Sequence, residues 1–261
     1  TFANEQEILS LVDAKSFHPY TPWLYGIATS QLGTLLPDLT DQIEASGSLP
    51  FQRLIDANRW NIRFRKGTVE TINNKKKRLV FSDGTELEYS KLVIGYGSVI
   101  NDFGVEGVAD NTYAIQTVEG AFSVRNRLSK LLDDTEKDRT IVIIGSGAVG
   151  VETAAELAHF IRKRNKDRMM AHKVVMLTAS KEVMANDIPF MRQQVQNRLE
   201  QLGIEVLFGA LCTKVSSTRV YFKMDGKDHE MPSNMTIWAG GLKPNPTIKV
   251  AGLERTKRNQ F

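Results

Sequence analysis

The residues whose types and spacing best fit a chemical role form the hexapeptide GSGAVG at positions 145–150. It follows a short apolar run and precedes a segment with helical periodicity. In this context Gly145 permits a tight turn, Gly147 lets the backbone approach a pyrophosphate, and Gly150 lets the helix pack closely on the strand. The free N–H groups at the start of the helix favour the negative charge of phosphates. We therefore interpret the motif as a dinucleotide-binding loop rather than a purely structural glycine turn.

The second part of this fingerprint, an acid that binds ribose, is missing from its usual place. NAD sites commonly have Asp or Glu at the end of the second strand, whereas the apolar run 174–177 continues into Thr178, Ala179, Ser180 and Lys181. Thr178 or Ser180 could bind a ribose hydroxyl. Lys181 could face the 2′-phosphate of NADP, although a solvated loop lysine is the simpler interpretation. The choice between NAD and NADP stays open.

The elements that must position the glycine loop alternate along the second half of the chain. Apolar runs predict strands at 141–144, 174–177, 205–208 and 235–239, with a hairpin at 213–223, and helical spacing predicts helices at 118–132, 149–161 and 189–202. Alternating strands and helices imply a parallel, right-handed, doubly wound sheet.

The first half shows a second nucleotide-binding signal in a strand at 8–12 that ends at Asp13, where an acid can bind ribose. The pattern further predicts a helical segment at 31–60, broken at Pro37 and restarted with Pro50 as the first helical residue, and strands at 61–64, 68–72, 78–81 and 86–89. Residues 91–97 predict an apolar strand buried on both faces that runs into a glycine turn open to a ligand.

Composition excludes several function classes. The net charge of +4 and pI near 9.1 rest partly on the basic runs 75–78 and 162–168, but no aromatic residues interleave with them, so we predict solvated faces and no nucleic acid. The same runs would suit anionic lipid or a mitochondrial matrix protein. The single cysteine, Cys212, forms no redox pair, and the four histidines are too scattered to suggest a metal set. No apolar run reaches the length of about 18 residues that a membrane span needs.

The glycine loop belongs to a longer segment, GSGAVGVETAAEL at 145–157, that resembles the NADH-binding motif of type II NADH dehydrogenases. Other segments resemble the same family in the same order. They are residues 12–13 with the aromatic and proline-rich loop 18–24, the hairpin 84–89, the glycine turn 92–97, and the strand end 236–241 with 244–246. The resemblance covers nearly the whole chain.

The resemblance implies hydride transfer from NAD(P)H to FAD and delivery of electrons to a quinone. It places Glu152 in the first turn of the nucleotide helix, directed at the nicotinamide amide, as the candidate catalytic residue; the alternative is a first-turn carboxylate stabilised by the helix dipole. Tyr96 departs from the small residue expected between its flanking glycines. The candidate cofactor-binding residues are Asp13, Pro22, Val69, Gly95, Tyr96, Gly97, Gly145, Ser146, Gly147, Ala148, Val149, Gly150, Thr178, Ala239 and Gly240.

The expected fold class is therefore α/β, a flavoprotein with two dinucleotide-binding domains in which a Rossmann-like NAD(P) domain is inserted in a partial FAD domain. We expect the FAD domain at 1–115 and 245–261 and the NAD(P)H domain at 116–244, with adjacent crossings at 108–118 and 242–248. The glycine loop for the FAD pyrophosphate belongs about 20 residues before the ribose acid, but only twelve residues precede Asp13 and none is glycine.

This truncated pattern leaves two interpretations. The native chain is longer and forms an ordinary flavoenzyme, or it is a non-catalytic relative that serves as a structural or assembly subunit of a larger complex. For the enzyme, the resemblance implies peripheral association with the mitochondrial inner membrane or a bacterial cytoplasmic membrane, through segments outside this sequence. A homodimer or larger complex is also an expectation.

Overall fold

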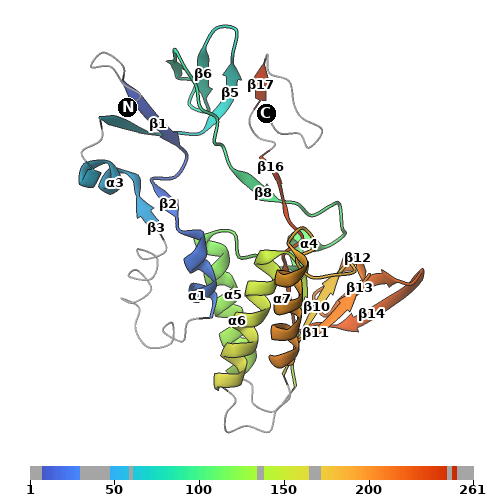
Figure 1. Ribbon diagram of the computed structural model, residues 1–261. Helices are drawn as coiled ribbons and strands as arrows, with labels where there is room; N and C mark the ends of the chain where they lie inside the picture. The colour runs from blue at the N-terminus through green and yellow to red at the C-terminus, as the bar shows by residue number, and fades with distance from the viewer. Residues whose placement is uncertain are drawn as a thin grey trace. The chain divides into compact units, whose positions relative to one another are not determined.

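The computed structural model describes residues 8–29, 48–58, 61–133, 138–164, 172–245 and 249–251 (Figure 1). The chain forms two compact units. The first unit comprises Thr1–Pro19, Ser48–Val99 and Leu242–Phe261, and the second comprises Tyr20–Gly47 and Ile100–Gly241. Each combines strands with helices, so the predicted α/β class is confirmed.

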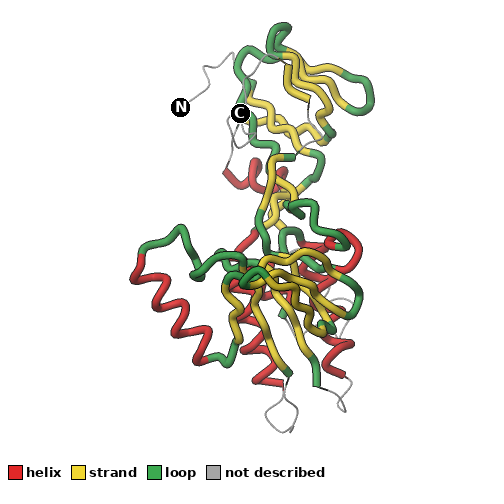
Figure 2. Tube along the Cα trace, turned by 90° about the vertical axis from the view of Figure 1, so that its right-hand side faces the viewer, coloured by secondary structure: helices red, strands yellow, loops and turns green. Residues whose placement is uncertain are grey.

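The second unit is built on a four-stranded parallel sheet whose strands run side by side (Figure 2). In order, the strands are β11 (Glu205–Phe208), β10 (Lys173–Thr178), β9 (Thr140–Ile144) and β15 (Met235–Trp238). The chain proceeds from β9 to β10 on one side and returns to β15 on the other. The order of strands thus switches direction at β9, and in open α/β sheets ligands bind at such a point, outside the carboxyl ends of the strands.

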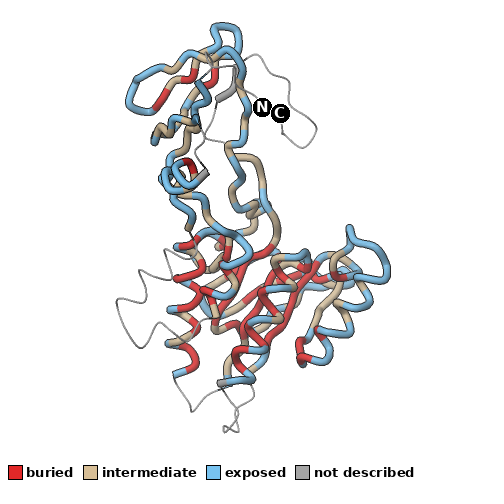
Figure 3. Tube along the Cα trace, turned by 60° about the vertical axis from the view of Figure 1, so that its left-hand side comes forward, coloured by how far each residue is buried: buried red, intermediate tan, exposed pale blue. Residues whose placement is uncertain are grey.

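Burial explains why β9 is the centre of this unit. Ile141, Val142 and Ile143 are fully buried, as expected for a strand covered on both faces. Buried residues also line the helices of the second unit (Figure 3). These helices are α1 (Leu24–Ala28), α4 (Val108–Asn111), α5 (Val118–Asp133), α6 (Ala148–Arg164) and α7 (Pro189–Gln201). Among the described residues, no helix has both the length and the apolar character needed to cross a bilayer.

A three-stranded antiparallel sheet completes the second unit. Its strands are β12 (Leu211–Val215), β13 (Arg219–Met224) and β14 (Lys227–Pro232). The predicted hairpin corresponds to β12 and β13. The prediction missed β14, because its sequence KDHEMP has the charged character of a loop. Cys212 lies buried on β12, and burial raises the pKa of its thiol to about 11.

The first unit contains a short parallel pair and a separate antiparallel meander. Strand β1 (Leu9–Asp13) pairs in parallel with β4 (Ile62–Lys66), and helix α3 (Phe51–Asn58) precedes β4, with the Phe51 and Phe64 ring centroids 5.3 Å apart. Helix α3 spans Phe51–Asn58 as predicted, but Pro50, which was predicted to be its first residue, ends strand β3 instead. Strands β2 (Phe17–Pro19) and β3 (Ser48–Pro50) form a small antiparallel pair.

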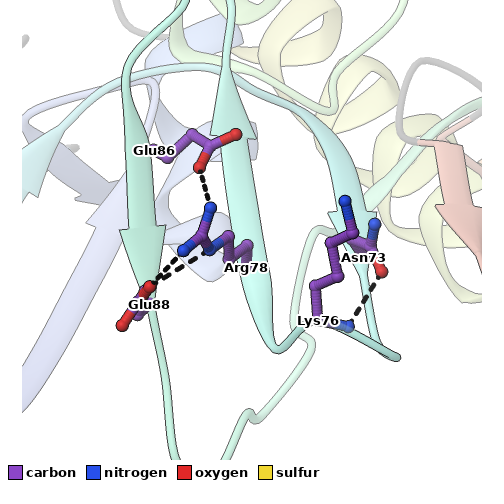
Figure 4. Close-up of polar contacts among 5 residues, drawn as sticks. All are labelled: Asn73, Lys76, Arg78, Glu86 and Glu88. Carbon is purple, nitrogen blue, oxygen red and sulfur yellow. Dashed lines mark hydrogen bonds and ion pairs between the residues drawn. The ribbon is translucent and has the colours of Figure 1, made fainter.

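The meander of the first unit joins β5 (Val69–Asn73), β6 (Arg78–Phe81) and β7 (Glu86–Glu88), with β17 (Lys249–Ala251) parallel to β5. The Arg78 guanidinium pairs with Glu86 at 3.0 Å and with Glu88 at 2.6 Å. The Lys76 backbone N–H donates to the Asn73 side chain, and Figure 4 shows these contacts. These groups are solvent-exposed, so each ion pair adds little to stability.

The prediction for residues 91–97 was wrong in two respects. The segment belongs to no hydrogen-bonded strand among the described residues, and Val93 is 96% exposed. Its neighbours Leu92 and Ile94 pack against the core of the meander, formed by Ile72, Leu79 and Phe81. Alternate side chains of an extended segment point in opposite directions, so only one side of this segment is covered.

The compact units divide the chain at different residues from the expected domains. Residues 20–29 and 100–115 lie in the second unit, since α1 packs against α5 and α6. The connection between units runs through β8 (Ser98–Ile100), which pairs with β16 (Leu242–Pro244), rather than through 108–118. The predicted helical residues 31–47 lie outside the described residues.

The central position of β9 yields a stability prediction. Ile143→Ala should lower the free energy of unfolding by about 3–4 kcal/mol, because the side chain is fully buried on a strand that lies between β10 and β15. The matched change Ile188→Ala, at a position 63% exposed before α7, should cost less than about 1 kcal/mol. Urea unfolding followed by circular dichroism checks both, and equal losses would contradict the assignment of β9 to the core.

Candidate dinucleotide-binding site

The glycine loop at 145–150 lies where the carboxyl ends of three strands meet. The N–H of Gly145 donates to the Leu177 carbonyl on β10 at 2.8 Å, and the N–H of Ala239 after β15 donates to the Ile144 carbonyl at 2.7 Å. A third bond runs from the Met184 N–H to the Ser146 carbonyl at 2.8 Å. The loop is therefore held from both sides at the switch point of the sheet.

The three glycines of the loop differ in what surrounds them. Gly145 has φ +114°, and a Cβ there would lie 2.3 Å from the Ala239 carbonyl oxygen. A Cβ on Gly150 would lie 2.1 Å from the Gly145 carbonyl oxygen. A Cβ on Gly147 would meet nothing within 4 Å. Contacts inside the protein thus leave no room for a side chain at Gly145 or Gly150, whereas the space above Gly147 is open.

Helix α6 starts at this open space. The Val151 N–H donates to the Gly147 carbonyl at 3.0 Å, so Gly147 is the N-cap and the next N–H groups have no partner within the helix. The first turn contains no acidic residue that would repel an anion. The arrangement can accept a phosphate on N–H groups and on the positive end of the helix dipole.

A buried hydroxyl pair ties the loop to the end of β10. The side chains of Ser146 and Thr178 hydrogen-bond at 2.8 Å, and the Thr178 hydroxyl also accepts the Ser180 N–H at 3.1 Å. Both residues are buried. The structure therefore brings Thr178 to the loop but engages its hydroxyl inside the protein. Its contact with a ribose stays a prediction, and the link to Ser146 had no signal in the sequence.

Two charged residues, Lys181 and Glu182, follow shortly after Thr178 at the end of β10. Lys181 is exposed, and Glu182 forms an ion pair with Arg192 of α7. Glu182 is the first acid after the end of β10, and its carboxylate is held by this arginine. The site therefore offers one acid and two cations within a short stretch of chain, and the choice between NAD and NADP is not decided by an acid at position 178.

Glu152 lies just beyond the first turn of α6, because the helix begins one residue earlier than predicted. Because α6 begins at Ala148, Glu152 is in the second turn, and the alternative of a first-turn carboxylate stabilised by the helix dipole loses its basis. Instead the exposed carboxylate forms a hydrogen bond with the phenol of Tyr25 from α1. Burial and the adjacent Glu152 charge raise the pKa of Tyr25 to about 12. Sequence reasoning missed Tyr25, since nothing local connects it to Glu152.

The strand end on the other side of the loop contains Ala239 and Gly240. Ala239 is buried, and a Cβ on Gly240 would lie 2.8 Å from the ring of Trp238. The Trp238 indole N–H donates to the Asn101 carbonyl at 2.8 Å, which fixes the ring. Both candidate residues thus adjoin the glycine loop.

The flavin-side candidates of the first unit adjoin one hydrophobic cluster. Val69 packs there, as do Val12 and Ile94, the residues directly before Asp13 and Gly95. The Asp13 carboxylate accepts the Lys15 N–H at 2.8 Å.

The remaining flavin-side candidates differ in exposure and backbone conformation. Tyr96 is half-buried, and Gly97 has φ +72°. A Cβ on Gly95 or Gly97 would meet nothing within 4 Å. Pro22 lies in the 3-10 helix Thr21–Trp23 of the second unit and is exposed.

The chain is similar in sequence to a known protein family and to several characterised proteins. The model of the family described as pyridine nucleotide-disulphide oxidoreductase matches residues 8–261. The chain is 27% identical over 258 residues to demethylphylloquinone reductase NdbB of Synechocystis, covering 96% of this chain and 58% of that protein. It is 24% identical over 261 residues to the type II NADH:quinone oxidoreductase NdhA of Mycobacterium tuberculosis, covering 93% and 53%.

A solved structure shares the fold. NDH2 from Plasmodium falciparum in complex with NADH aligns with a TM-score of 0.75 at 17% identity, covering 92% of this chain and 51% of that one. These proteins confirm the resemblance to type II NADH dehydrogenases and the predicted two-dinucleotide architecture. The chain spans about half the length of the relatives it matches. Since the family model covers nearly all of its residues, the chain belongs to the pyridine nucleotide-disulphide oxidoreductase family.

Proposed function

We propose that this chain provides the NAD(P)H site and part of the flavin site of a dehydrogenase that passes a hydride from NADH to FAD and electrons on to a quinone. The observation that carries the proposal is the open space above Gly147 at the N-terminus of α6. No contact inside the protein requires glycine there, whereas a pyrophosphate lying on the backbone would.

The proposed roles of the residues follow from their positions. Gly145 and Gly150 shape the turn, and the N–H groups at Gly147, Ala148 and Val149 hold the pyrophosphate. Ser146 and Thr178 keep the turn fixed to β10 through their buried hydroxyl bond. Ala239 and Gly240 border the other side of the loop. Together these groups orient the dinucleotide, which is the contribution a protein makes to cofactor chemistry.

Glu152 is proposed to contact the nicotinamide carboxamide from the second turn of α6. A carboxylate accepts hydrogen bonds from an amide NH₂ group, and its exposure leaves it accessible to a ligand. The residue would set the ring orientation without taking part in bond changes.

The first unit fits a flavin nucleotide at three places. Asp13 at the end of β1 would accept a ribose hydroxyl, and Gly95 and Gly97 leave room for a ligand against the backbone. Tyr96 between them and Val69 on β5 complete the proposed flavin set of the first unit, and the flavin role of Pro22, which belongs to the second unit, stays a prediction. When bound, FAD supplies the hydride-accepting chemistry that side chains lack.

The relatives support the acceptor and the location in broad terms. NdhA is named as a quinone oxidoreductase, and other relatives are named mitochondrial external NAD(P)H-ubiquinone oxidoreductases. We propose a quinone acceptor and peripheral membrane association, at the mitochondrial inner membrane or a bacterial cytoplasmic membrane. Nucleic acid is not a proposed partner, and self-association into a homodimer stays a prediction.

Gly147→Asp should abolish NADH binding while preserving the fold. The new side chain meets no protein atom, and Asp is a favoured N-cap residue, so the thermal midpoint should hold or rise. Its charge and volume would occupy the pyrophosphate position. Fluorescence titration with NADH is the measurement. A folded variant that binds NADH with unchanged affinity would refute the site.

Gly150→Ala and Gly147→Ala form a matched pair for stability. The first should lower the free energy of unfolding by about 2–3 kcal/mol, because its Cβ would lie 2.1 Å from the Gly145 oxygen. The second should leave stability within about 0.5 kcal/mol. Denaturant unfolding compares the two, and a Gly150→Ala protein as stable as wild type would contradict the tight turn.

The electron-transfer part of the proposal is tested on the protein purified from its natural source. We expect a flavin absorption spectrum and NADH-dependent reduction of a soluble quinone, with the intact mass measured on the same sample. A colourless protein that purifies only with partner proteins would instead support the structural-subunit interpretation.

A further inference from the structure

Helix α1 is short, yet its position in the second unit is fixed. Leu24, Ile27 and Ala28 are at most 1% exposed, and the helix packs against α5 and α6. At its end, the N–H and the hydroxyl of Thr29 both donate to the Tyr25 carbonyl, at 3.1 and 3.0 Å. The backbone of Tyr25 is therefore anchored by three buried neighbours and a closed helix end.

The Tyr25 side chain reaches Glu152 of α6 from this anchored backbone. It is only half-buried, unlike its neighbours, and its phenol bonds to the Glu152 carboxylate. Exposed glutamates on helices normally sample several rotamers, and holding one costs side-chain entropy. A partner from a fixed element removes part of that freedom before any ligand arrives.

We propose that Tyr25 is the positioning residue for Glu152, holding its carboxylate ready to accept the carboxamide of a bound nicotinamide. This role rests on the function proposed above for Glu152. A carboxylate has two oxygens and can accept several hydrogen bonds. With one bond made to Tyr25, the exposed carboxylate still has acceptor capacity for a ligand amide.

The direction of the hydrogen bond follows from the two groups. An ionised carboxylate only accepts, so the phenol O–H is the donor. The pKa of Tyr25, raised to about 12, keeps the phenol protonated throughout the neutral range. Such charge-assisted bonds are stronger than neutral ones, which suits a contact that must hold an exposed side chain.

The test compares NADH with ADP-ribose, which has the pyrophosphate and adenosine but no nicotinamide. Tyr25→Phe removes only the hydroxyl and should weaken NADH binding about tenfold while leaving ADP-ribose affinity unchanged. Glu152→Gln changes the other partner of the same contact and should also weaken NADH binding without changing ADP-ribose affinity. In the double variant the two losses should not add, because both changes break one unit. Tyr221→Phe, on β13, is the matched control and should change neither affinity.

Each other outcome has a defined meaning. Unchanged NADH affinity in Tyr25→Phe would overturn the positioning role and leave the dinucleotide site standing. An equal loss of ADP-ribose would overturn it too, since Tyr25 would then support the fold. If Glu152→Gln bound NADH with wild-type affinity, Glu152 would not contact the nicotinamide. The positioning role of Tyr25 would then be wrong as well. A wild-type protein that binds neither ligand would overturn the proposed function itself.

Discussion

The close approach of three backbone segments at the carboxyl ends of β9, β10 and β15 is the constraint on which the nucleotide unit depends. Side chains are too large for these contacts, as the distances at Gly145 and Gly150 show, where a Cβ would come within 2.3 and 2.1 Å of carbonyl oxygens. Because the contacts are between backbone atoms, they position the start of α6 with little freedom. Gly145 and Gly150 are packed tightly against backbone atoms, and Gly147 between them faces open space.

The sheet makes this approach possible. Strand β9 is buried on both faces and is paired on both edges, by β10 and β15, so its end is fixed before the loop begins. The buried bond between Ser146 and Thr178 then secures the turn laterally. Polar groups at such depth must be paired, and here the pairing joins two adjacent strand ends. The rigid sheet therefore supplies the geometry, and the loop supplies the N–H groups.

Local patterns were sufficient to predict most of this unit from sequence. The apolar runs of β9, β10 and β15 and the helical spacing of α5 and α6 are strong signals, and Pro189 marks the start of α7. Strand β14 was missed because alternating charges on an exposed edge resemble a loop. The segment 91–97 was misread because an apolar run does not reveal whether a neighbouring strand covers it, and Val93 is uncovered.

The candidate site likewise combines features that the sequence predicts with contacts that it does not. The glycine loop is a contiguous motif, so its position was predictable, whereas the bonds of Thr178 to Ser146 and of Tyr25 to Glu152 join segments distant in sequence. Glu152 itself was predicted, but its place in the second turn depends on where α6 begins. Long-range pairs arise from the fold as a whole, and no spacing along one chain encodes them.

The most direct test of the glycine-loop site is an NMR titration of the full chain with NADH that follows the backbone amide signals. We expect the N–H resonances of Gly147, Ala148 and Val149 to shift until the site is saturated with NADH, while those of β12–β14 stay unchanged. Saturable NADH binding that leaves the resonances of these three loop amides unchanged would contradict the site at the start of α6, because the pyrophosphate would then lie elsewhere.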